Sequence, residues 1–175
     1  MYGPNEVNEV ATRAYELSVR ADRLLDQGDL AQAKTLMTEA AMIDGTYAVR
    51  AELLGVPDTR RVRVNPAVKK LVVPFLTDAG FLQNPLGLAY GDRIFERSRS
   101  SNTHFLFISR TKFRQVLGTL AGRYSNPSDV VYFDWRLTNV QSGALAYRTQ
   151  REVEAVCTRL TELLAQWVFP WLDSR

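Results

Sequence analysis

Two residue types with catalytic or metal-binding chemistry each occur once in this sequence, as His104 and Cys157. An imidazole can act as a general base near neutral pH when a carboxylate orients it. The carboxylates considered for that role are Asp92, Glu96, Asp129 and Asp134. No spacing selects one of them, and neither a serine elbow nor a glycine-rich phosphate loop accompanies the histidine. We therefore expect no catalytic residue. An enzyme that uses His104 as a general acid or base is kept as the second alternative to the binding function given below.

The same counts bear on metals, cofactors and disulfides. One cysteine cannot form an internal disulfide, and one cysteine with one histidine leaves zinc or iron almost no ligands except carboxylates. Cys157 lies on the apolar stripe of a predicted helix, where a buried thiol is normally inert. We expect no metal site and no cofactor.

Basic side chains are concentrated in the middle of the chain. Residues 60–123 contain 12 Lys or Arg against 3 Asp or Glu, whereas residues 1–59 contain 5 against 10. Those that fall on predicted strands or their turns form the candidate partner-binding set: Arg93, Arg97, Arg99, Arg110, Lys112, Arg114 and Arg123. Guanidinium groups pair bidentately with carboxylates, so we expect a non-catalytic binding protein that recognises an acidic protein partner.

Other partners fit the same residues. Aromatic side chains that could stack on bases interleave with the basic ones: Phe95, Phe105, Phe107, Phe113 and Tyr124. A protein that binds RNA or single-stranded nucleic acid is therefore the first alternative. The basic residues of 60–123 could also bind the acidic residues of 1–59, either within one chain or between the two chains of a homodimer.

The elements that must position these residues begin with two helices. One apolar stripe recurs every three or four residues at Val7, Val10, Ala14, Leu17, Ala21 and Leu24. Gly28 should end that helix, and Asp29 can cap a second one. We expect an antiparallel helical hairpin, followed by a short helix that Thr46 caps and that ends near Leu54.

The spacing within the hairpin also fits a known family. The residues that carry the fit are Leu17, Ala21, Leu24, the Gly28–Asp29 turn, Ala33, Met37 and Ala40. Over about residues 15–45 they resemble one tetratricopeptide repeat, in which small residues let paired helices approach closely. The sequence departs from that pattern at Arg20 and Gly45, and no second copy is visible.

A linker and a further helix follow the hairpin. Residues 56–64 read as an exposed basic segment. Asn65 can cap a helix with Pro66 at its first position, Pro74 should kink or end it, and Gly80 should close it.

From Leu86 to Leu137 the apolar period changes from helical to alternating, which predicts a four-stranded antiparallel sheet. The expected strands are Asp92–Ser98, His104–Arg110, Gln115–Tyr124 and Val130–Leu137. A three-residue turn at Ser100–Asn102 would place Phe95 opposite Phe107, and a slip of one residue would exchange the faces. Gly118 and Gly122 are interpreted as a bulge or a bend.

The last element is a helix that packs on the sheet. Thr149 and Glu152 have the spacing of a capping box, and an apolar stripe runs from Val153 to Trp167. The order of elements predicts an α+β fold, with an acidic helical hairpin region at 1–56 and an α+β domain at 65–175. Since no apolar run could span a bilayer and residues 5–16 contain three glutamates, we expect a cytoplasmic protein without a membrane segment.

Overall fold

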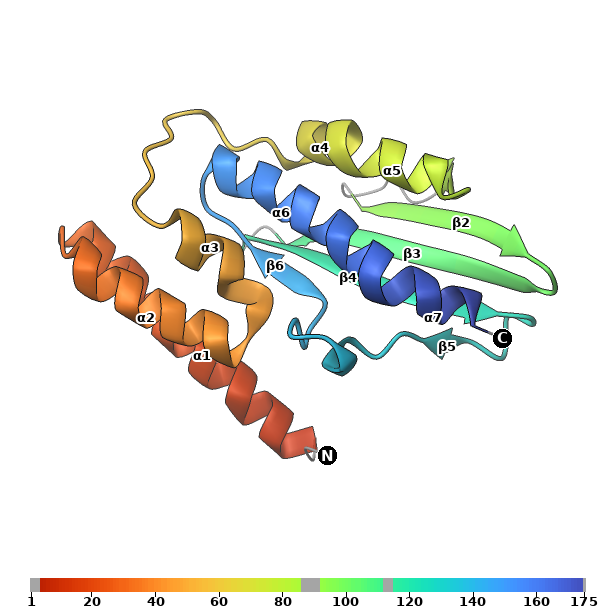
Figure 1. The fold of residues 1–175 in the computed structure, drawn as a ribbon, viewed down its shortest axis with the longest axis horizontal. Coiled ribbons are helices and arrows are strands. Elements are labelled where there is room, and N and C mark those ends of the chain that lie inside the picture. The colour runs from red at the N-terminus through yellow and green to blue at the C-terminus, as the bar shows by residue number, and fades with distance from the viewer. Residues whose placement is uncertain (1–3, 86–91, 112–114, 175) are drawn as a thin grey trace.

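The computed structural model describes residues 4–85, 92–111 and 115–174. It shows an α+β fold in which helices and one antiparallel sheet form a continuous body, with a helical hairpin at one end (Figure 1). None of the helices in those ranges combines the length and hydropathy that a bilayer-spanning segment needs.

The N-terminal hairpin forms where the apolar spacing predicts it. Helix α1 (Pro4–Asp26) and helix α2 (Leu30–Ile43) are antiparallel, and Gly28 adopts a φ of +84° that favours glycine between them. The carboxylate of Asp29 accepts a hydrogen bond from the backbone N–H of Gln32 at 3.1 Å, which confirms it as the cap. A small apolar cluster of Ala21, Ala33, Met37 and Leu54 joins the hairpin to the next helix.

The short helical segment after the hairpin begins with a different cap from the expected one. A 3₁₀ turn, η1 (Gly45–Tyr47), precedes helix α3 (Ala48–Leu53). Asp44 provides the cap, because its carboxylate accepts a hydrogen bond from the Thr46 backbone N–H at 3.0 Å. The prediction of Thr46 as the cap is therefore wrong: Asp44 caps the 3₁₀ turn, and Tyr47, which directly precedes α3, makes no side-chain capping bond.

Two long helices each contain a π-helical segment just before a proline. Helix α4 (Val64–Ala67) continues through η2 (Val68–Val72) into α5 (Val73–Asp78), and helix α6 (Gln150–Leu163) continues through η5 (Leu164–Val168) into α7 (Phe169–Asp173). Proline has no N–H to donate, and the wider π turn leaves room for its ring. The first helix therefore passes Pro74 and ends at Asp78, followed by Gly80 at a φ of +84°.

The starts of these two helices differ in how well the sequence predicted them. Helix α4 begins one residue before Asn65, and Arg63 at its cap position makes no side-chain capping bond, so the expected Asn65 cap is wrong. The capping box of Thr149 and Glu152 at the start of α6 is confirmed in both of its hydrogen bonds.

The sheet contains more strands than the four expected. Its strands are β1 (Leu82–Asn84), β2 (Arg93–Arg99), β3 (Asn102–Thr111), β4 (Val116–Tyr124), β5 (Val131–Tyr132) and β6 (Ala144–Ala146). The order is β1-β2-β3-β4-β5, with β6 also paired to β4 and every pair antiparallel. Both strands that the sequence reading missed are three residues long, too short to show an alternating pattern.

Three details of the strand reading are corrected. The β2–β3 turn has two residues, so Phe95 lies opposite Leu106 and not opposite Phe107. The fourth predicted strand stops at Tyr132, because Asp134 accepts a hydrogen bond from the Arg136 backbone N–H at 3.0 Å and starts the 3₁₀ turn η4 (Trp135–Leu137). Strand β4 pairs with β3 without interruption through both of its glycines, so it has no bulge there.

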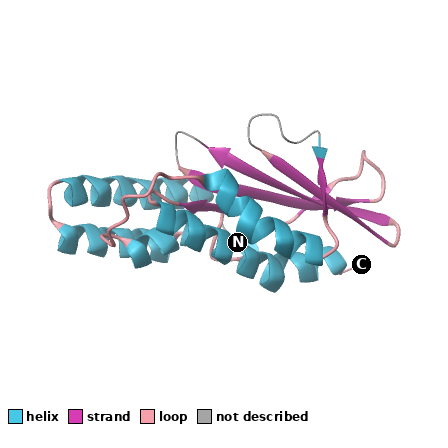
Figure 2. Cartoon of the chain, turned by 90° about the horizontal axis from the view of Figure 1, so that it is seen from above, coloured by secondary structure: helices cyan, strands magenta, loops and turns pink. Residues whose placement is uncertain are grey.

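The helices α4–α5 and α6–α7 lie on one side of the sheet (Figure 2). That side contributes Phe95, Leu106, Ile108, Leu117 and Ala121 to the main core, which also includes the inner residues of α6. We call this side the covered face. The side chains of the other side, the open face, alternate with these along each strand.

Candidate functional site

The arginines of the predicted partner-binding set lie on the covered face of the sheet. Arg97 pairs with His104, which pairs with Arg123, and directly opposite residues in an antiparallel pair point to the same side. Arg93 lies opposite Ile108 and Arg110 opposite Leu117, and both of those partners are core residues. Arg99 lies two residues after Arg97 on β2 and therefore points to the same side of the sheet. Lys112 and Arg114 lie outside the described residues.

Arg97 is held inside the protein. Its side chain is 4% exposed, and its guanidinium lies 4.5 Å from the Phe81 ring centroid and 5.4 Å from that of Phe169. It donates hydrogen bonds to Asp173 Oδ1 at 2.6 Å and to the Ala79 carbonyl at 3.0 Å. Burial is the main reason that its pKa is lowered. The structure therefore corrects its assignment: Arg97 joins two helix ends to the sheet and is not available to a partner.

The other arginines of the set are partly engaged as well. Arg123 donates to the Trp171 carbonyl at 3.0 Å and lies over the Trp171 ring, and Arg93 donates to Gln83 at 3.0 Å. Arg110 is half-buried. Of the five described members, Arg99 alone is exposed, so these five do not form a continuous basic surface.

His104 contributes a structural contact to the same covered face. It is 2% exposed, and its Nδ1 accepts a hydrogen bond from Arg97 Nε at 3.2 Å. Burial, followed by the adjacent Arg97 cation, lowers its pKa, so the imidazole is neutral with its proton on Nε2. A general base needs a nitrogen that substrate can reach, and this arrangement offers none at Nδ1.

Cys157 is inaccessible as a nucleophile. It is fully buried in the main core, and burial raises the pKa of its thiol to about 12. Among the described residues, no group of three or more His, Cys, Asp or Glu side chains could hold a metal ion.

A groove with basic walls lies between the linker, the start of α4 and the start of α6. We call it the basic groove, and its volume is about 650 Å³. Its lining residues are Arg60, Pro66, Ala67, Lys70, Leu71, Gln150, Arg151, Glu154, Ala155 and Thr158. Arg60, Lys70 and Arg151 are exposed. The sequence indicated the linker arginines, but only the tertiary structure brings Arg151 beside them.

Arg60 is oriented by two carboxylates at the rim of this groove. Its guanidinium donates to Asp58 at 3.0 Å and to Glu154 at 2.9 and 3.3 Å. The hydrogen bond from Arg60 lowers the pKa of Asp58 to about 2. Asp58 also accepts the backbone N–H of Arg151 at 2.7 Å, so one carboxylate fixes the linker against the first turn of α6.

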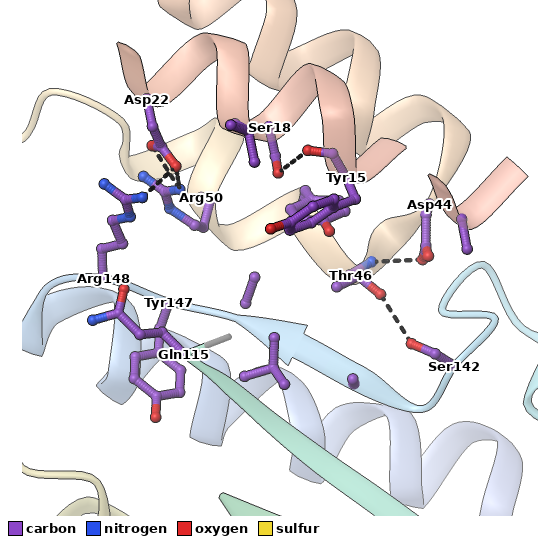
Figure 3. Close-up of a pocket in the computed structure, with 16 residues that line it drawn as sticks. Tyr15, Ser18, Asp22, Asp44, Thr46, Arg50, Gln115, Ser142, Tyr147 and Arg148 are labelled. Atoms are coloured by element: carbon purple, nitrogen blue, oxygen red, sulfur yellow. Dashed lines mark hydrogen bonds and ion pairs between the residues drawn. The ribbon is translucent and has the colours of Figure 1, made fainter. Parts of the chain in front are cut away.

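A second hollow, which we call the junction cavity, lies between the hairpin and the sheet (Figure 3). It has a volume of about 450 Å³ and is lined by α1, the η1–α3 segment, β6 and the start of β4. Asp22 at one end contacts two arginines, Arg50 Nη1 at 2.9 Å and Arg148 Nη2 at 2.7 Å. At the other end the hydroxyls of Thr46 and Ser142 lie 3.4 Å apart.

These contacts show where the acidic hairpin makes its buried ion pair. Arg50, the buried partner of Asp22, itself lies within the acidic residues 1–59. Arg148 lies after the basic residues 60–123. Within the described ranges, the ion pair between residues 1–59 and residues 60–123 is the local one of Asp58 with Arg60. Among the side chains that the structure describes, the acidic residues of 1–59 and the basic residues of 60–123 therefore form no broad salt-bridge surface with one another.

No family model, curated protein or solved structure matches this chain. Its function must therefore be argued from the residues of the groove and the cavity.

Proposed function

We propose that this chain is a non-catalytic binding protein whose basic groove takes an acidic segment of a partner protein. The supporting observation is the distribution of exposed cations. The sheet arginines are largely covered, whereas Arg60, Lys70 and Arg151 flank one groove and Arg61, Arg63 and Lys69 are exposed on the same linker and helix. The acidic-partner hypothesis is thereby kept, and its site moves from the sheet to the groove.

The chemistry of the groove favours a particular kind of segment. Arginine and lysine on its walls attract carboxylates, while Pro66, Ala67, Leu71 and Ala155 provide an apolar floor. A peptide with an apolar side chain between acidic residues would satisfy both, because the apolar contact holds it and the charges orient it.

The groove supports a protein partner more strongly than a nucleic acid. None of its ten described lining residues is aromatic, so unpaired bases would find no ring to stack on there. The aromatic side chains Phe105, Phe107 and Tyr124 belong to the open face of the sheet. The first alternative requires exposed cations and rings side by side, but the cations of the basic groove and these rings of the open face lie on separate surfaces.

The test is binding of a fluorescent peptide of alternating Glu and Leu to the full chain. The double variant Lys70→Glu/Arg151→Glu should weaken binding about tenfold or more, because two attractive contacts become repulsive. The matched control is Arg20→Glu/Lys34→Glu, which makes the same charge change at exposed positions of the hairpin. Equal losses in both variants, or no binding by the unmodified chain, would refute the groove.

A single-stranded oligonucleotide tests the alternative in the same assay. Phosphate contacts release counterions, so its affinity should fall steeply with salt if the chain binds nucleic acid. Tighter binding of the oligonucleotide than of the acidic peptide would replace the proposed partner class. The resemblance of the hairpin to a tetratricopeptide repeat and a homodimer remain predictions, and sedimentation of the full chain would test the second.

A further inference from the structure

We propose that the junction cavity is a binding site for an uncharged cyclic polyol, the chemistry of a monosaccharide or of the sugar of a nucleoside. This site is separate from the basic groove and does not depend on the function proposed for it. Three features of the cavity support such a ligand: its paired charges, its hydrogen-bonding groups and the aromatic ring between its two ends.

The charged groups at the Asp22 end of the cavity are already paired before any ligand enters. Asp22 contacts both Arg50 and Arg148, and Arg50 Nε lies 3.6 Å from Glu152 Oε2. Glu152 is in turn fixed by the N–H of Thr149 at 3.1 Å in the capping box. Two cations and two carboxylates thus form one network, and a ligand with a net charge would have to separate them.

The opposite end of the cavity offers two hydroxyl groups beside the Asp44 carboxylate, which already accepts a hydrogen bond from the Thr46 backbone N–H at 3.0 Å. Figure 3 shows the Thr46 and Ser142 hydroxyls there, at a distance from the Asp22 cluster. Nearer the Asp22 end, Gln115 adds an exposed amide beside Arg148 (Figure 3). Hydroxyls and amides both donate and accept, which matches the hydroxyl groups of a polyol better than it matches a pure acceptor such as phosphate.

Tyr15 lies between these two ends. Figure 3 shows its ring reaching from α1 over the cavity, and the side chain is 50% exposed. An aromatic ring with a polar tip suits a sugar ring, which has an apolar face and polar edges. The volume of about 450 Å³ falls in the range of small-molecule sites, and the position between two structural units is typical of such sites.

One backbone conformation adds to this picture. Gln115 has a φ of +49°, one of two non-glycine residues with a positive φ among the described residues. Its carbonyl accepts a hydrogen bond from the Tyr147 backbone N–H at 3.0 Å. A residue held in an unfavourable conformation at the edge of a cavity directs its side chain at a cost in stability, which function can offset.

The experiment is calorimetric titration of the full chain with methyl glucoside and with adenosine, which distinguish a free sugar from a nucleoside. Inorganic phosphate and glutamate serve as charged comparators. At least one polyol should bind with a Kd of about 1 mM or tighter, and more tightly than either charged compound. Failure of both polyols to bind, or tighter binding of a charged comparator, would overturn the proposal.

Two variants locate the binding. Tyr15→Ala should weaken it about tenfold, while Tyr132→Ala, the same change at a residue that is 54% exposed on the sheet, should alter it less than about twofold. Gln115→Gly removes the amide and accepts a positive φ without strain, so a severalfold loss there would come from the side chain. Unchanged binding in both cavity variants would refute the site.

The groove variant separates this proposal from the previous one. Lys70→Glu/Arg151→Glu should leave polyol binding unchanged, because neither residue lines the junction cavity. Loss of polyol binding in that variant would place the ligand in the groove and contradict the cavity assignment.

Discussion

The two faces of the sheet differ in which side chains they bury and which they expose. On the covered face, Arg97 and His104 are almost completely buried with hydrogen-bonding partners. On the open face, the Phe105 ring centroid lies 5.9 Å from that of Tyr132 and 6.1 Å from that of Tyr124, and Tyr132 is 54% exposed. A guanidinium and an imidazole are therefore buried while several rings are partly exposed, the reverse of the usual expectation.

The difference shows that a long cation can be a core residue when its ends are satisfied. The guanidinium of Arg97 is stacked on rings and bonded to a carboxylate at the end of α7, so covering it leaves few groups unpaired. Arg123 similarly donates to the last carbonyl groups of that helix. The number of arginines on the predicted strands therefore does not show how many of them are exposed.

The open face has its own internal packing. A Cβ atom at Gly122 would lie 2.4 Å from Phe105 Cζ, so glycine at this position makes room for the ring. This explains why glycine stands in a regular strand, where it otherwise weakens the structure. The rings of the open face thus form a local cluster.

The strongest test of the two faces uses adjacent residues of β3. Leu106→Ala should destabilise the protein by about 3 kcal/mol, because Leu106 is fully buried on the covered face. Phe107→Ala removes a larger side chain but should cost only about 1 kcal/mol, since Phe107 is half-buried on the open face. Urea unfolding followed by circular dichroism measures both. A larger loss for Phe107→Ala would contradict the assignment of the faces.

A smaller effect is expected from the covered arginine. Arg97→Ala should cost about 2 kcal/mol, because it leaves His104 Nδ1 and the Ala79 carbonyl without their donor. Arg99→Ala, two residues further on the same strand but exposed, should change stability by less than about 0.5 kcal/mol. The same unfolding measurement applies, and equal effects would mean that Arg97 is not buried in solution.

The smallest effect concerns pH. The pKa of His104 is lowered in the folded protein, so below about pH 6.5 the unfolded chain takes up the proton first and stability falls as pH decreases. The slope is at most about 1.4 kcal/mol per pH unit for one group. His104→Gln should remove this component between pH 7 and pH 5, whatever its effect on absolute stability. An unchanged slope in the variant would show that other groups produce it.

The parts of the fold that the sequence predicted correctly depend on neighbours in the chain. The capping box at Thr149 and Glu152 is satisfied within four residues, and the turn at Gly28 needs only a residue that tolerates a positive φ. The apolar stripes of the long helices were equally readable, because helical spacing brings their residues to one side without any distant contact.

The errors in the fold arise where a difference of one residue decides the outcome. A two-residue turn at Ser100 and Ser101 in place of a three-residue one moved Phe107 to the open face and Leu106 to the covered face. In the fourth predicted strand the apolar residues do alternate from Val131 to Leu137, but the strand ends where Asp134 accepts a hydrogen bond from the Arg136 backbone N–H. Apolar periodicity along the sequence reveals neither the length of that turn nor the hydrogen bond to Asp134.

The residues of the two proposed sites were predictable only in part. The basic linker was evident, but Lys70 and Arg151 line one groove because the α4–η2 segment packs beside α6, which no spacing along the chain predicts. The junction cavity was missed entirely, since Tyr15, Thr46 and Ser142 are far apart in the sequence and individually ordinary.

By itself the sequence determined the helical hairpin, the capped C-terminal helix, the α+β class and the uneven distribution of charge. Local hydrogen bonds and periodic burial suffice for these. The tertiary structure decided which face of each strand the helices cover, and therefore that most sheet arginines are engaged and the groove cations remain exposed. The physical reason is that exposure depends on what packs above a side chain, and that is set by strand register and helix docking over long stretches of chain.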